Sequence, residues 1–366
     1  MQLQKERQNV QQLEHFYEST PKAVGFIERK TDIPSHTINL YGPPGAGKTW
    51  LVLDYINRLP KKRRLYVDMS DLRLDVESLS ANLQEFIESN DIESVVLDHY
   101  TPKLPLPKCR QVITVTQTPF KQNPFTPLLE ISSLDFEEYL AFERRHQSLE
   151  HSFSQYLRCG SLPSMAHVSD SLLTMELHKN IRSIFPSEKE VALFRYMARF
   201  QGKPLTPYQL YGIMKKDYKI SKDWLYKSVN EMEKRGVVTW LHKFDQPKAT
   251  KKLLFYDFAM PASLYFEKSL MGQLQSIAAK KLQKRAQTLY YTDKIDFLDY
   301  EERRAILLSP FANQQSGATK VVRIAQELES YNIKEVLILT IANSFAFTFE
   351  KRAVKAIPFY EWVLQD

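Results

Sequence analysis

Cysteine and long apolar runs are both scarce in this sequence of 366 residues. Cys109 and Cys159 are the only cysteines, which excludes a disulfide-stabilised scaffold and fits a reducing compartment. Paired Cys and His residues at the spacing of a zinc site are also missing. No stretch approaches the roughly 18 apolar residues of a membrane span, and the N-terminal residues are polar. We therefore expect a cytoplasmic protein without a membrane segment.

The composition is typical of a globular protein, with 43% hydrophobic and 25% charged residues. The chain is too long for one ordinary hydrophobic core, so several domains are expected. Changes of pattern along the chain predict four parts: 1–119, 120–185, 186–260 and 261–366. The formal net charge of +7 suggests an anionic partner, although the distribution of that charge is more informative.

The most specific motif is a glycine-rich loop between a predicted strand and a predicted helix. Residues 36–41 are typical of a strand, and the apolar residues after Thr49 recur at helical spacing. A phosphate-binding loop requires this context, in which backbone N–H groups and the helix dipole surround the phosphates. We expect Lys48 to reach the β- and γ-phosphates and the Thr49 hydroxyl to bind Mg²⁺. The predicted contacts to ATP or ADP are Gly42, Pro43, Pro44, Gly45, Ala46, Gly47, Lys48, Thr49 and Trp50.

A carboxylate for the same Mg²⁺ ion is predicted at the end of another buried strand, 94–98. Asp98 ends this strand, in the position of a Walker B aspartate. Further strands are predicted at 64–68 and 111–116, which indicates a parallel sheet with helices on both faces. An extra strand between the two motifs resembles the additional-strand P-loop ATPases, which include the AAA+ group. The resemblance implies a polar sensor at Thr116 or Gln117.

The residue after Asp98 departs from this resemblance. That group normally has a glutamate there to polarise the attacking water, whereas this chain has His99. A histidine can orient water but is a poor substitute for a fixed carboxylate. Asp68 or Asp71 could supply a carboxylate from the neighbouring strand. Slow ATP hydrolysis and a nucleotide-held switch both remain open.

Residues 120–185 have a helical pattern and are predicted to form a lid. Within it, residues 156–163 resemble a segment of a large family of bacterial and archaeal P-loop ATPases, with Cys159 in place of a glycine. That family joins an AAA+-like domain to a winged helix and a C-terminal restriction-endonuclease-like domain. The resemblance implies that Gly160 and Pro163 lie on the adenine side, the alternative being a plain turn between lid helices. By analogy alone, Arg144 or Arg145 could meet the γ-phosphate as an arginine finger, whereas most such pairs are solvated surface charges.

Residues 186–260 are predicted to form a winged helix-turn-helix. Capping signals at Ser187, Thr206 and Ser221 each precede a helical pattern, and strands are expected at 237–241 and 253–257. The segment 187–257 contains 15 Lys and Arg against 8 Asp and Glu, an excess equal to the net charge of the whole chain. We expect double-stranded DNA as the partner, bound mainly through its phosphates. The predicted DNA contacts are Lys222, Tyr226, Lys227, Asn230, Lys248, Lys251 and Lys252.

Residues 261–366 follow the element order of the restriction-endonuclease-like domain of the same family. Asp296 matches the first metal-binding carboxylate of active nucleases, but Leu307 and Ser309 stand where a glutamate and a lysine would be needed. We therefore expect a scaffold without nuclease activity. The leading hypothesis is an AAA+-like ATPase whose nucleotide state controls DNA engagement. The alternative is a switch of the signal-transduction (STAND) type that binds a protein partner, and a homo-oligomer is also possible.

Overall fold

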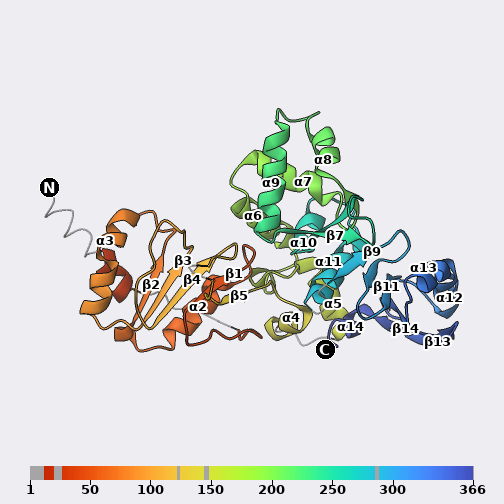
Figure 1. Cartoon of the computed structure of the whole chain (residues 1–366), viewed down its shortest axis with the longest axis horizontal. Helices are drawn as coiled ribbons and strands as arrows, with labels where there is room; N and C mark the ends of the chain where they lie inside the picture. The colour runs from red at the N-terminus through yellow and green to blue at the C-terminus, as the bar shows by residue number, and fades with distance from the viewer. Residues whose placement is uncertain (1–11, 20–26, 122–123, 144–147, 285–287, 366) are drawn as a thin grey trace. The chain divides into compact units, whose positions relative to one another are not determined.

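The computed structural model describes residues 12–19, 27–121, 124–143, 148–284 and 288–365. They form two compact units, one up to Ser133 and one from Leu134 on (Figure 1). Each unit is described by itself. The predicted division into four parts stays a prediction. In the described ranges, no helix combines the length and apolarity needed to cross a bilayer.

The first unit contains a parallel sheet of five strands in the order β2-β3-β4-β1-β5. The strands are β1 (Ile38–Tyr41), β2 (Arg64–Asp68), β3 (Ser94–Asp98), β4 (Gln111–Thr116) and β5 (Leu128–Glu130). This unit also contains the helices α2 (Lys48–Asn57), η1 (Lys61–Arg63) and α3 (Val76–Ser89). The bounds predicted for β2, β3 and β4 are confirmed. Strand β5 was not predicted, because its three residues are only partly buried and lie in a range where a helical pattern dominates.

Both faces of this sheet are covered, as predicted for a parallel sheet. Val96 of β3 packs in a cluster with Val52 and Ile56 of α2. Its neighbours Val95 and Leu97 pack in another cluster, which contains the apolar side of α3. Successive strand residues point to opposite faces, so a strand buried on both faces needs a continuous apolar run. The carboxyl ends of the strands are therefore held by packing on two sides.

The second unit begins with helices and continues into a mixed sheet. Its helices are α4 (Phe136–Phe142), α5 (Leu149–Cys159), η2 (Pro163–Met165), α6 (Leu173–Ile184), α7 (Glu188–Ala198), α8 (Pro207–Met214), α9 (Lys222–Lys234), α10 (Ala259–Ser263), α11 (Leu270–Gln283), α12 (Gln314–Arg323), α13 (Ala325–Ser330) and α14 (Phe359–Trp362). The predicted caps are present: Ser187 and Thr206 form capping boxes, and Ser221 accepts a hydrogen bond from the Trp224 N–H. Ser269 caps the start of α11, where its hydroxyl accepts a hydrogen bond from the Gly272 N–H at 3.1 Å.

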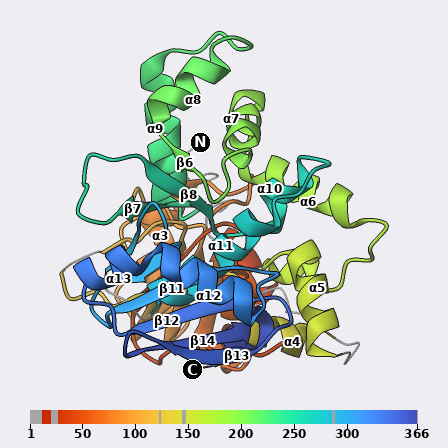
Figure 2. The same ribbon diagram turned by 90° about the vertical axis from the view of Figure 1, so that its right-hand side faces the viewer.

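The sheet of the second unit has nine strands in the order β13-β14-β12-β11-β10-β9-β7-β8-β6. The strands are β6 (Pro204–Leu205), β7 (Val238–Lys243), β8 (Lys251–Phe255), β9 (Leu289–Tyr291), β10 (Phe297–Asp299), β11 (Arg304–Leu308), β12 (Glu335–Thr340), β13 (Phe345–Phe349) and β14 (Arg352–Pro358). Strand β7 pairs in parallel with β9, with His242 opposite Tyr290. Figure 2 shows α12 and α13 in front of strands β11, β12 and β14. The hairpin of residues 186–260 and the C-terminal strands therefore belong to one continuous sheet.

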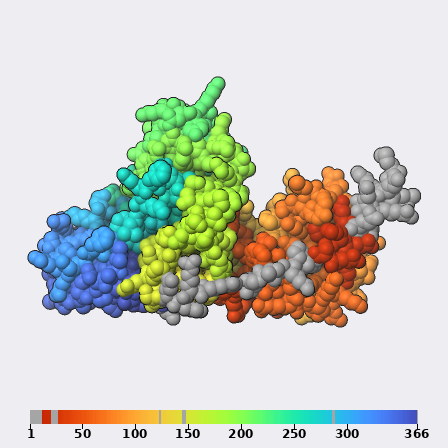
Figure 3. Space-filling model, turned by 180° about the vertical axis from the view of Figure 1, so that it is seen from behind, coloured from red at the N-terminus to blue at the C-terminus, as the bar shows by residue number. Residues whose placement is uncertain are grey.

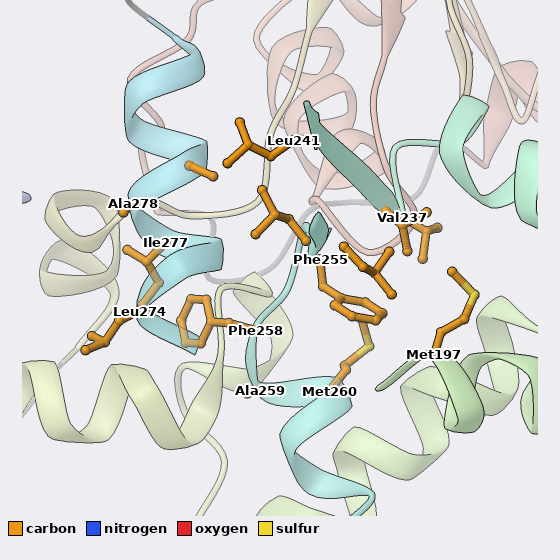
Figure 4. Packing of buried hydrophobic residues seen from close by; sticks show 14 of the residues in the cluster. Met197, Val237, Leu241, Phe255, Phe258, Ala259, Met260, Leu274, Ile277 and Ala278 are labelled. Atoms are coloured by element: carbon orange, nitrogen blue, oxygen red, sulfur yellow. The ribbon is translucent and has the colours of Figure 1, made fainter. Parts of the chain in front are cut away.

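One large apolar cluster holds this unit together. Leu274, Ile277 and Ala278 of α11 pack in it with Leu241 of β7 and Phe255 of β8 (Figure 4). The same cluster contains buried residues of α5, α7 and α14. Burying a large apolar side chain contributes about 1.5–3 kcal/mol. Helix α11, from the predicted part 261–366, thus packs against the β7–β8 hairpin, from the predicted part 186–260.

Candidate nucleotide-binding site

The glycine-rich loop lies between the end of β1 and the start of α2, as predicted. Gly42, Gly45 and Gly47 have φ angles of 150°, 76° and 91°, which L side chains rarely adopt. A Cβ atom on Gly42 would lie 2.1 Å from the carbonyl oxygen of Ile131. Glycine is therefore required at Gly42 for two independent reasons, backbone conformation and a close approach.

The ammonium group of Lys48 lies at this loop. Its Nζ donates hydrogen bonds of 2.8 Å to the carbonyl oxygens of Gly42 and Pro43. Ala46 is buried, Thr49 is half-buried, and Trp50 is 49% exposed beside them. A lysine held over a loop of backbone N–H groups at a helix start is a suitable binding site for the phosphates of a nucleotide.

Asp98 ends β3 as a fully buried carboxylate. Its Oδ2 accepts a hydrogen bond of 2.9 Å from the Tyr66 hydroxyl, and its Oδ1 accepts one of 2.8 Å from the His99 N–H. In the described part of the chain, no three His, Cys, Asp or Glu side chains could hold a metal by themselves. A Mg²⁺ ion here would need oxygen ligands from the nucleotide in addition to Asp98 and Thr49, which matches its preference for phosphate oxygens and water.

His99 adopts a left-handed backbone conformation with φ of 52°. Its Nδ1 is 3.0 Å from Asp68 Oδ1 and 3.8 Å from Asp98 Oδ1. Asp68 is the in-register neighbour of Asp98 on the adjacent strand. Partial burial acts to raise the pKa of Asp68, but hydrogen bonds from Ser70 and His99 outweigh it and lower that pKa. Asp68 is therefore anionic and holds the side chain of His99, which stands where a glutamate was expected.

Asp71, the other carboxylate that sequence analysis considered, belongs to a local turn. Its side chain pairs with Arg73 at 2.6 Å, and hydrogen bonds from that arginine lower the pKa of Asp71. Of the two candidate carboxylates, Asp68 is the one that contacts His99 in the structure. The contribution of Asp71 to water activation stays a prediction.

The end of β4 is tied to β1 by a buried amide. Asn39 Nδ2 donates to the hydroxyl oxygens of Thr114 and Thr116 at 3.0 Å, and Asn39 Oδ1 accepts from the Phe120 N–H at 2.8 Å. Thr116 also donates to the Thr118 carbonyl. Gln117 is exposed. Asn39 was missed by sequence analysis, although a polar residue inside the apolar strand before the glycine-rich loop was a usable signal.

Gly160 and Pro163 lie in the second unit. Gly160 has φ of 84°, and a Cβ atom there would lie 2.5 Å from Asp257 Oδ2. Asp257 is fully buried and accepts hydrogen bonds from the Ser161 N–H and hydroxyl, at 2.6 and 3.0 Å. Burial raises the pKa of Asp257, while these hydrogen bonds act against the rise. The turn is thus packed into the second unit, and its place on the adenine side stays a prediction. Arg144 and Arg145 lie outside the described residues.

The predicted DNA-contacting residues of α9 are all exposed. They are Lys222, Tyr226, Lys227 and Asn230. The Lys222 ammonium lies 5.5 Å from the ring centroid of Tyr208 and 5.6 Å from that of Tyr226. Tyr208, at the start of α8, is 65% exposed. Helices α8 and α9, in green, form a projecting end of the second unit in Figure 3. We call Tyr208, Lys222, Tyr226, Lys227 and Asn230 the basic-aromatic surface.

The predicted lysines of the hairpin differ among themselves. Lys248 is exposed and Lys251 is half-buried. Lys252 instead has its ammonium 4.6 Å from the Tyr291 ring centroid, and burial lowers its pKa. Lys252 lies in β8 and not in the loop before it, and its contact with DNA stays a prediction.

The carboxylate of Asp296 is occupied by protein donors. It accepts hydrogen bonds from the Leu308 N–H at 2.8 Å and from Gln275 at 3.3 Å, and Lys320 Nζ lies 3.9 Å away. Leu307, where a nuclease would have its second carboxylate, is fully buried. Within the described residues no cluster of acidic and histidine side chains at this position could hold a metal. The expectation of a scaffold without nuclease activity stays a prediction.

A similar sequence is found among curated proteins. It is the Lon protease of Porphyromonas gingivalis, 26% identical over 248 residues that cover 63% of this chain. The chain spans about a quarter of the length of that protein, since the match covers 26% of it. No protein-family model matches.

Several solved structures resemble this chain at low similarity. A Walker-type ATPase of Pyrococcus abyssi has a TM-score of 0.43 and 12% identity, over 72% of this chain and 95% of that one. A signal transduction ATPase with numerous domains from Pyrococcus horikoshii has a TM-score of 0.31 and 14% identity, over 74% and 47%. The Aeropyrum pernix Orc1 protein in complex with DNA has a TM-score of 0.31 and 11% identity, over 76% and 93%. Because these similarities are low, the fold of the first unit is assigned from its strand order and its glycine-rich loop alone.

Proposed function

We propose that this chain is an AAA+-like P-loop ATPase that binds ATP with Mg²⁺, and that its nucleotide state controls engagement of double-stranded DNA. The observation that carries the proposal is the glycine-rich loop, with Lys48 on its carbonyl oxygens and Asp98 at the end of a strand of the same sheet. Strand β4 separates the strand of the loop from that of Asp98, which is the order of the additional-strand ATPases.

Each residue has a definite task in this proposal. The loop N–H groups and the start of α2 would bind the phosphates, and Lys48 would neutralise the β- and γ-oxygens. Thr49 and Asp98 would hold Mg²⁺, which stabilises the charge that develops on the phosphates during transfer. Tyr66 orients the Asp98 carboxylate through its hydroxyl, and His99, held by Asp68, would orient the attacking water.

The second unit supports the DNA part of the proposal. Its element order α7-β6-α8-α9-β7-β8 is that of a winged helix-turn-helix, in which the third helix lies in the major groove. The basic-aromatic surface offers lysines for phosphates and tyrosine faces for sugars or bases. We expect contacts mainly to the backbone, because the exposed residues of α9 include no arginine within the helix.

Duplex binding can be tested by fluorescence anisotropy at several salt concentrations. The double variant K222E/K227E is expected to bind at least tenfold more weakly and to lower the salt slope by about two, since each phosphate contact contributes about one. K61E/K62E, on η1 of the first unit, has the same change of net charge and is the matched control. Equal binding by the wild type and both double variants would refute DNA engagement by this surface.

One observation favours a second candidate function, a nucleotide-held switch that binds a protein partner. His99 is held by Asp68 at the position where rapid ATPases place a glutamate, which predicts slow turnover. This candidate requires nucleotide to copurify with the chain and hydrolysis to be negligible. Rapid steady-state hydrolysis would exclude it, whereas DNA-stimulated hydrolysis would favour the first proposal.

A further inference from the structure

The last residues of the first unit contact the glycine-rich loop and the end of β1 through hydrogen bonds and one close backbone approach. The Ile131 N–H donates a hydrogen bond of 2.7 Å to the Tyr41 carbonyl, and the Ile131 carbonyl touches Gly42. Arg29 donates from one guanidinium nitrogen to the Ala46 carbonyl at 2.9 Å and from the other to the Ser132 carbonyl at 2.8 Å. Any change in the loop that moves Gly42 or Ala46 therefore acts directly on Ile131 and Ser132.

The first residue of the second unit is equally well attached on its own side. Leu134 is fully buried, and its N–H donates to the Ser161 carbonyl at 2.7 Å. Its carbonyl accepts hydrogen bonds from the Tyr156 hydroxyl at 2.9 Å and from Lys280 Nζ at 3.2 Å. Only Ser132 and Ser133 separate Leu134 from Ile131. A chain gains at most about 3.6 Å per residue when extended, so the two attached segments are joined by a short covalent link.

The hydrogen bonds continue from Leu134 to the hairpin of the proposed winged helix. Ser161, which accepts from Leu134, donates its N–H to Asp257 Oδ2 at 2.6 Å. Asp257 stands two residues after the end of β8, and its Oδ1 accepts from the Ala259 and Met260 N–H groups. The absence of a side chain at Gly160 allows this carboxylate its close approach.

We infer that residues 131–134 transmit the state of the glycine-rich loop to the β7–β8 hairpin, with Arg29 as the positioning residue on the loop side and Asp257 on the hairpin side. The inference rests on the proposed nucleotide binding and adds the route by which it controls DNA affinity. Phosphates fix the loop by binding its N–H groups, so the peptide that carries the Ala46 carbonyl is fixed as well. The Arg29 guanidinium is a rigid fork, so it holds Ala46 and Ser132 at a set separation.

Hydrogen exchange of backbone amides in the full chain, with and without ATP and Mg²⁺, tests the loop side. In the wild type we expect nucleotide to slow exchange at least fivefold in peptides covering 131–134 and 160–161. In R29A, ATP should still bind within about tenfold of the wild-type affinity, while the nucleotide-induced slowing in these peptides is lost. R29K should restore part of it, because lysine can donate to one of the two carbonyls. R73A, which removes a surface ion pair of the same unit, is the matched control.

A purely structural role for Arg29 would speed exchange equally with and without nucleotide, which would overturn the inference. Wild-type binding of ATP without any change at 131–134 would overturn it as well, while leaving the proposed nucleotide binding intact. Failure of the wild type to bind ATP would instead overturn the proposed function, and the inference with it. The wild-type and R29K measurements decide the question even if R29A does not fold.

Duplex affinity of the D257N variant tests the hairpin side. This variant keeps the shape of the side chain but weakens its acceptance of the Ser161 N–H. We expect ATP affinity and DNA affinity without nucleotide to stay within threefold of the wild type, and the effect of ATP on DNA affinity to fall to less than a third. An unchanged effect of ATP in D257N would overturn the role of Asp257.

Discussion

The Tyr66 hydroxyl donates a hydrogen bond of 2.9 Å to Oδ2 of Asp98, from the strand next to the one that Asp98 ends. This contact fixes a buried carboxylate that the proposed site uses for Mg²⁺. Burial and the neighbouring Asp98 carboxylate both raise the pKa of Tyr66, so it remains a donor at all ordinary pH values.

Removing the hydroxyl in Y66F should destabilise the nucleotide-free chain by about 1.5–3 kcal/mol, the usual range for a hydrogen bond to a charged group. Added ATP and Mg²⁺ should recover part of this loss, because the cation then satisfies the Asp98 oxygen. Urea denaturation with and without ATP·Mg²⁺ measures both effects. Y55F, which removes a hydroxyl bonded to the neutral Gln111 amide, is the control with a smaller expected loss. An equal loss in both states would argue against Asp98 as a metal ligand.

Replacing His99 by glutamate should raise the steady-state rate of ATP hydrolysis by about tenfold or more. A glutamate there would place an anionic carboxylate near the site, whereas the Nδ1 of His99 is engaged by Asp68, and the like charges of Asp68 and Asp98 would raise the pKa of that glutamate toward neutrality. H99N is the matched control, because asparagine tolerates the left-handed backbone of this position but supplies no base. A phosphate-release assay compares the three proteins, and equal rates would place water activation elsewhere.

Alanine at Gly42 should abolish ATP binding and lower the melting temperature. Its Cβ would lie 2.1 Å from the Ile131 carbonyl oxygen at a φ of 150°, so the loop or β5 must move. Gly212, inside α8, provides the opposite control, because a Cβ there meets nothing within 4 Å. G212A should stabilise the chain by about 0.5–1 kcal/mol through helix propensity. Calorimetry of both variants shows whether the lower melting temperature of G42A comes from the close contact or from replacing a glycine as such.

The stability of the second unit should rise with pH above neutrality because of Lys280. Burial, reinforced by Lys284, lowers the pKa of Lys280 from 10.5 to about 7. Between these values the unfolded chain binds more protons than the folded chain, so raising the pH from 7 to 10.5 stabilises the folded state. Below pH 7 the cost of burying the charged lysine is fully present. K280M should flatten this rise in denaturation curves, whereas K179M on the exposed side of α6 should leave it unchanged.

Local patterns predicted the elements that carry the site, and long-range pairings decided the rest. The apolar run ending in Asp98 gave the bounds of β3, because both faces of that strand are buried. The short, partly exposed β5 has no comparable signal. The contact between Arg29 and Ser132 joins residues 103 positions apart, outside any regular element, so no periodicity could reveal it. The contact of Lys252 with the Tyr291 ring could not be foreseen for a similar reason, since it depends on the pairing of β7 with β9.

The parallel pairing of β7 with β9 also has a practical consequence for work with fragments. A chain shortened to end near residue 260 would remove β9 and α11, leaving β7 with unpaired backbone groups and its apolar side uncovered. Exposed edges of this kind recruit other chains and lead to aggregation. The natural unit for expressing the basic-aromatic surface alone therefore begins at Leu134 and extends through the last strands.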